Sequence, residues 1–150
     1  MIFTIVFGAL AFANFITLTG MTGHLVDWIQ AQKMGVFGVL MAMMVIYLVL
    51  GCVMEAMGLM ILTVPVFAAI AQQMGISLIW FGIFVTVMIE IGMLTPPVGM
   101  NVFTVKTMHP DIALSTIFKG VMPFLVANLI AVLLLIVFPQ IALFPLKWFQ

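Results

Sequence analysis

Long apolar runs separated by short polar segments make up most of the chain. The runs are continuously apolar, whereas membrane β-strands alternate apolar and polar residues, so helices are the predicted structure. Several runs approach the length of about 20 residues with which a helix crosses a bilayer. The pattern predicts one all-α membrane domain over 1–150, with a transmembrane helix over 1–19, an interfacial segment over 20–35, a hairpin or two short spans over 36–74, an interrupted helix over 76–108 and a last transmembrane helix over 118–144.

Composition supports the membrane assignment. Hydrophobic residues make up 67% of the chain and charged residues only 5%, against roughly 25% charged in soluble domains. The N-terminus begins without a positively charged segment, which argues for a membrane span over a cleaved signal peptide. The formal net charge is zero and no Arg occurs, so a nucleic-acid partner, which needs a basic patch, is excluded. Cys52 is the single cysteine; it excludes an intrachain disulfide and is expected to be a small buried residue.

The segment over 36–74 carries an unusual cluster of Gly51, Glu55 and Gly58 in its middle. It fits two short spans, and it equally fits a re-entrant hairpin whose tip holds these residues near mid-membrane. Non-helical backbone is tolerated at that depth only where protein or a watery cavity covers it, as it would at a hairpin tip. For Glu55, a structural role and a functional role both remain open.

The segment over 76–108 contains the strongest motif, a proline pair inside an apolar run. Pro96 and Pro97 lack amide protons, Thr95 before them is pushed out of helical geometry, and Gly92 and Gly99 loosen both flanks. The motif predicts a broken helix. Its two halves would direct free carbonyls and free amides at one another, an arrangement that holds a cation on one side and an anion on the other.

Side chains near this break add candidate ligands, each with a structural alternative. Thr95 and Asn101 bring oxygens that suit sodium, but Thr95 could bond back to its own helix and Asn101 could cap the second half-helix. Glu90 is a carboxylate at membrane depth, which is costly and faces either a structural partner or an ion. His24 and His109 are predicted in polar loops, and no HExxH motif occurs, so neither a metal site nor an intramembrane enzyme is expected; no cofactor is expected either.

The run WFGIFVTVMIEIGMLTPPVGMNVF resembles the C-terminal broken helix of the large, DctM-like membrane subunit of TRAP (tripartite ATP-independent periplasmic) transporters. LGCVMEAMGLMILTVPVF is similar to the second re-entrant hairpin of that family, and FKGVMPFLVANLIAVLLLIVFPQIAL to its last helix. The resemblance covers essentially the whole chain, and EIGMLTPPVG is its specific part. Full members contain two inverted repeats, so the resemblance implies that this chain holds one half of an elevator-type carrier, as a fragment or a split gene product that does not transport by itself.

The resemblance also implies a function. Such permeases sit in the bacterial inner membrane, work with a small membrane subunit (DctQ-like) and a periplasmic substrate-binding protein (DctP-like), and use sodium to import organic acids such as C4-dicarboxylates or sialic acid. Sodium is then expected at carbonyls of Gly92, Thr95 and Pro96. The substrate carboxylate is expected near the amides from Val98 to Asn101, with Pro97 and Gly99 shaping the break and Glu90 nearby. A non-transporting anchor or assembly subunit is the alternative.

Overall fold

The computed structural model describes residues 2–96 and 99–144, and every regular element in these ranges is a helix, which confirms the predicted all-α class. Their bounds are α1 Ile2–Leu18, α2 Met21–Ala31, α3 Val36–Gly51, α4 Ala56–Gln73, α5 Leu78–Leu94, α6 Met100–Met108, α7 Leu114–Val137 and α8 Gln140–Leu143.

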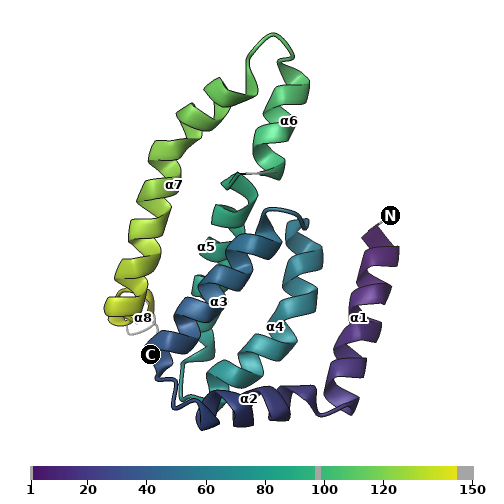
Figure 1. Cartoon of the computed structure of the whole chain (residues 1–150), viewed down its shortest axis with the longest axis vertical. Helices are drawn as coiled ribbons and strands as arrows, with labels where there is room; N and C mark the ends of the chain where they lie inside the picture. The colour runs from purple at the N-terminus through teal and green to yellow at the C-terminus, as the bar shows by residue number, and fades with distance from the viewer. Residues whose placement is uncertain (1, 97–98, 145–150) are drawn as a thin grey trace.

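The helices are arranged around a hairpin and a broken helix (Figure 1). α3 and α4 form the hairpin, and its tip lies at the level of the break between α5 and α6. α7 runs back along α5 and α6 and contacts both, while α1 packs on α4. α2 lies crosswise at the end of the hairpin away from the tip. The arrangement therefore brings two interruptions of the backbone, far apart in sequence, to the same depth.

Helix length sorts these elements into two groups. α4, with 18 residues, and α7, with 24, are long and apolar enough to cross a membrane. α3 and α5 are shorter apolar helices; at about 1.5 Å per residue each is about 25 Å long, less than the hydrocarbon core of about 30 Å. An untilted crossing therefore needs α5 and α6 together, with the break inside the bilayer.

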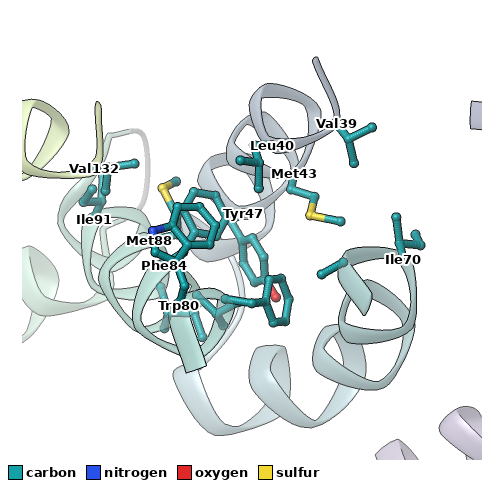
Figure 2. Packing of buried hydrophobic residues seen from close by; sticks show 14 of the residues in the cluster. Val39, Leu40, Met43, Tyr47, Ile70, Trp80, Phe84, Met88, Ile91 and Val132 are labelled. Carbon is teal, nitrogen blue, oxygen red and sulfur yellow. The ribbon is translucent and has the colours of Figure 1, made fainter. Parts of the chain in front are cut away.

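A buried cluster joins the hairpin to α5 (Figure 2). Tyr47 and Phe84 lie fully buried in its centre. The hydroxyl of Thr63 in α4 donates to the carbonyl oxygen of Leu59 at 2.7 Å and lies 2.9 Å from the hydroxyl of Tyr47 in α3. Because a hydroxyl has only one proton, Tyr47 is the donor to Thr63. This buried bond ties the two arms of the hairpin together below the tip.

A hydrogen bond from Trp80 links α5 to the end of α7. The indole N–H donates to the carbonyl oxygen of Leu135 at 3.0 Å. That oxygen would normally accept from the amide four residues later, but the residue there is Pro139, which has no amide proton. The indole thus satisfies a carbonyl that the helix itself leaves without a donor. Trp80 also stacks on Phe84, with ring centroids 5.5 Å apart.

Two parts of the chain differ from the sequence predictions. The last long helix begins at Leu114 and ends at Val137, not at 118 and 144, because Pro139 ends it and a short α8 follows. Most of the segment over 20–35 is helical as α2, which begins after a left-handed Gly20. The loop prediction for His24 was therefore wrong: it is an exposed residue of α2.

Candidate functional site: the hairpin tip and the helix break

The hairpin tip is the turn between the end of α3 at Gly51 and the start of α4 at Ala56. Glu55 is the N-cap residue of α4: its two carboxylate oxygens accept from the amides of Met57 at 3.0 Å and Gly58 at 3.2 Å. Such a cap satisfies two of the amides that a helix start leaves without partners. The geometry therefore gives exposed Glu55 a structural role, and Gly58 is buried directly behind it.

α3 and α5 come into backbone contact at a pair of glycines. A Cβ built on Gly51 would lie 2.8 Å from the Cα of Gly92, and one built on Gly92 would lie 2.7 Å from the Cα of Gly51. The Gly92 Cβ would also lie 3.1 Å from the carbonyl oxygen of Tyr47. Since all these neighbours are backbone atoms, any side chain at either position would push the helices apart. The pair sets how closely the tip approaches the break.

The backbone at the break has the conformation expected next to a proline. α5 ends at Leu94, and Thr95 has extended dihedral angles (φ −82°, ψ 134°), as expected before a proline. The amide of Thr95 donates to the carbonyl oxygen of Gly92 at 3.1 Å, and its hydroxyl donates to that of Ile91 at 2.6 Å. The carbonyl oxygen of Gly92 would normally accept from the amide four residues later, but that residue is Pro96, which has no amide proton. One threonine thus satisfies two carbonyls at the helix end, which is the structural alternative predicted for it.

Further backbone oxygens at the end of α5 face Gly99 on the other side of the break. Gly99 has a left-handed conformation (φ 52°). A Cβ on it would lie 3.3 Å from the carbonyl oxygen of Thr95 and 3.4 Å from that of Leu94. Glycine is required here for its dihedral angles and for this space. The thiol of Cys52 at the hairpin tip donates to the carbonyl oxygen of Pro96 at 3.5 Å, so tip and break are joined directly.

The remaining predicted residues are placed differently. Pro97 and Val98 lie outside the described residues. Asn101 is exposed in the first turn of α6. The N-cap of this helix is Gly99, and no side chain of the described residues caps it, so capping, the structural alternative for Asn101, is wrong. Glu90 is exposed on α5. Two residues advance a helix by about 200°, so Glu90 points away from Gly92 and the tip.

Sequence reasoning missed part of this site. Cys52 is buried as predicted, but its contact with Pro96 carries no sequence signal, because a lone apolar cysteine is typical of ordinary packing. Among the described residues, no group of three His, Cys, Asp or Glu side chains is placed to hold a metal ion.

Comparison with known proteins identifies relatives along almost the whole chain. The family model for the DctM component of tripartite ATP-independent periplasmic transporters matches residues 1–141. The sialic acid TRAP transporter permease protein SiaT of Haemophilus influenzae is 40% identical over 106 residues, which cover 71% of this chain and 17% of that protein.

Other relatives are named for other substrates. The ectoine TRAP transporter large permease protein TeaC of Halomonas elongata is 31% identical over 134 residues, 89% of this chain and 31% of that protein. The C4-dicarboxylate TRAP transporter large permease protein DctM of Pseudomonas aeruginosa is 26% identical over 148 residues, 99% of this chain and 34% of that protein. The chain thus spans between 17% and 34% of the length of these three relatives.

Proposed function

The chain belongs to the family of DctM components of tripartite ATP-independent periplasmic transporters, and from this premise we propose that it forms the part of a sodium-coupled large permease that binds the coupling ion and a small organic acid. The observation that carries the proposal is the contact of the hairpin tip with the helix break, through Gly51 with Gly92 and Cys52 with Pro96. A purely anchoring protein would not need two backbone interruptions that lie at the same depth and contact each other.

The sodium ion is proposed to bind at the carboxyl end of α5. Hard cations take oxygen ligands, and the partial negative charge of a helix C-terminus favours them. Thr95 donates its only hydroxyl proton to Ile91, so the lone pairs of that hydroxyl oxygen remain available to a cation. The carbonyls of Leu94 and Thr95, which face Gly99, are further donors; those of Gly92 and Pro96 already accept one hydrogen bond each.

The substrate carboxylate is proposed to bind at the start of α6. The amides of Val102 and Phe103 both donate to the carbonyl oxygen of Gly99 at 2.8 and 3.1 Å. Within the described ranges, the preceding amides of Met100 and Asn101 have no hydrogen-bond acceptor. Such first-turn amides and the helix dipole attract anions. Since this chain has no Arg, a guanidinium clamp would come from elsewhere in the permease.

The wider assignment follows the family. We propose that the permease works in the bacterial inner membrane with a small membrane subunit and a periplasmic substrate-binding protein, and that the hairpin and broken helix move together as an elevator. Relatives named for sialic acid, C4-dicarboxylates and ectoine support the proposal of a small solute with a carboxylate, and the relative with the highest identity among the three is named for sialic acid.

The test is sodium-driven uptake in proteoliposomes that contain the complete permease with this chain and its partner subunits. Labelled sialic acid, succinate and ectoine serve as substrates. Thr95→Val removes one proposed sodium ligand and should raise the sodium concentration for half-maximal uptake by about tenfold, the equivalent of 1.4 kcal/mol. Thr95→Ser keeps the hydroxyl and should resemble the wild type.

Two outcomes would oppose the proposal. Unchanged sodium activation in a folded Thr95→Val permease would remove Thr95 from the ion site. No uptake of any of the three acids, with an assembled complex and a binding protein that captures its ligand, would favour the anchoring alternative. Melting temperatures of both variants distinguish loss of the ion ligand from loss of the hydrogen bond to Ile91.

A further inference from the structure

One face of α5 points away from the core of the chain. Leu78, Gly82, Thr86 and Glu90 follow at intervals of four residues, lie on one side of the helix and are all exposed. We call these four residues the outward face of α5. The opposite side of the same helix is buried against α3, α4 and α7. Glu90, at the end of this face nearest the helix break, lies on the far side of α5 from Gly92 and the hairpin tip and plays no part in the site described above.

A groove runs beside the outward face, between α5 and α4. It has a volume of about 390 Å³ and is lined on the α4 side by Met60, Val64 and Ala68, and on the α5 side by residues that include Gly82 and Thr86. A Cβ on Gly82 would meet nothing within 4 Å. The small size of Gly82 is thus not needed for packing among the described residues, although helical glycine costs stability.

Glu90 lies at the C-terminal end of the outward face, at a depth where a charged side chain is energetically costly. α5 begins after the polar turn that contains Ser77, and Glu90 lies about 18 Å farther along the helix axis, near the middle of a hydrocarbon core of about 30 Å. Among the described residues no cation pairs with it: Lys106, for example, donates to the carbonyl oxygens of Pro110 and Ile112. A carboxylate at this depth is not left facing lipid; it faces a polar partner.

We propose that the outward face of α5 and its groove dock a transmembrane helix from outside this chain, and that this helix places a Lys or Arg side chain against Glu90. The relatives are several times longer than this chain, so a complete permease has further helices to supply it. A groove beside a helical glycine lets another helix approach closely, and the charge of Glu90 determines the chemistry of the partner. This inference concerns assembly and does not depend on the proposed transport activity.

The experiment measures what surrounds the outward face in the complete permease complex, reconstituted in lipid. Thr86→Cys, and separately Ile79→Cys at the edge of this face, are spin-labelled in a Cys52→Ala background. Collision rates with oxygen, which concentrates in lipid, and with a water-soluble nickel chelate are then recorded. Spin-labelled lipid in the same vesicles is the reference for lipid exposure. Low collision rates with both reagents at both positions are expected, because a protein helix covers the face.

A photoreactive amino acid at Thr86 then identifies the covering segment by mass spectrometry. We expect a transmembrane segment with a Lys or Arg, and we expect Glu90→Lys to impair assembly and to be rescued when that residue is exchanged for Glu. Oxygen collision at both positions equal to that of the lipid label would overturn the proposal in favour of a lipid-facing surface. Nickel collision at both would overturn it in favour of a watery cavity. A crosslinked segment without Lys or Arg would overturn the charge pairing.

Discussion

Replacing Gly92 by alanine adds a single methyl group at the place where α5 touches α3. The new Cβ would lie 2.7 Å from the Cα of Gly51 and 3.1 Å from its carbonyl carbon. Carbon atoms pack at about 3.5 to 4.0 Å, so the two helices would have to separate by about 1 Å. Rotamer changes cannot relieve the clash, because the opposing atoms belong to the backbone.

The cost of this separation has two parts. Overpacking a well-packed interior costs typically about 1–3 kcal/mol, and we expect Gly92→Ala in the upper part of this range. The separation also moves the hairpin tip away from the break, where the thiol of Cys52 already lies at 3.5 Å from the carbonyl oxygen of Pro96. Sodium and substrate binding should therefore weaken together, since both proposed half-sites depend on the same approach of the helices.

The assay compares thermal unfolding and substrate uptake of the purified permease complex. Gly38→Ala is the matched control: it lies in α3, and its new Cβ would meet only the flexible end of Met34 at 3.5 Å and Met34 Cβ at 3.9 Å. Gly92→Ala should lower the melting temperature by several degrees, while Gly38→Ala should not. Gly51→Ala should resemble Gly92→Ala, and the double variant should cost less than the sum, because the first methyl group already separates the helices. Equal melting temperatures for Gly92→Ala, Gly38→Ala and the wild type would refute the reasoning.

Two further substitutions test how α5 and the hairpin tip are held. Trp80→Phe leaves the carbonyl oxygen of Leu135 without a donor and should destabilise the complex by about 1–3 kcal/mol; Trp28→Phe, at a tryptophan that is 58% exposed, is the control, and equal melting temperatures would count against the role of Trp80. Glu55→Ala removes the cap of α4 and should cost about 0.5–2 kcal/mol, whereas Glu55→Asn keeps a capping oxygen without the charge. If Glu55→Asn loses uptake but keeps its stability, the carboxylate acts on an ion or substrate and is not merely a cap.

Much of the fold could be predicted from the sequence because its causes are local. The end of α5 follows from the proline pair, which removes amides and forces Thr95 into extended geometry. The helices follow from uninterrupted apolar runs. Both bounds of the last helix were predicted wrongly: Leu114 follows a polar loop and no proline marks the start, and the prediction extended the helix past Pro139, which does mark its end.

The contacts of the candidate site could not be predicted in the same way. Gly51 and Gly92 lie 41 positions apart in the sequence, and nothing in either local pattern indicates that they touch. The orientation of Glu90, in contrast, could have been predicted, because its spacing from Gly92 determines the side of the helix on which it lies. A helical residue two positions from Gly92 points to the other side of the helix, so Glu90 and Gly92 could not both have faced the hairpin tip.

This separation of Glu90 from Gly92 explains how a chain with so few charges can carry two different kinds of intramembrane interaction. Around Gly92 the polar groups are backbone carbonyls and amides, freed by prolines and brought together by glycines; in the proposed site they would bind ligands through dipoles, and the strength of that binding would depend on how closely α3 and α5 approach. At Glu90 the polar group is a full charge, which binds through a partner that must come from elsewhere. The two can be disrupted independently: Gly92→Ala should weaken ligand binding in an assembled complex, whereas Glu90→Lys should impair assembly itself. If both variants failed in the same assay and to the same degree, the two faces of α5 would have to be treated as one coupled site.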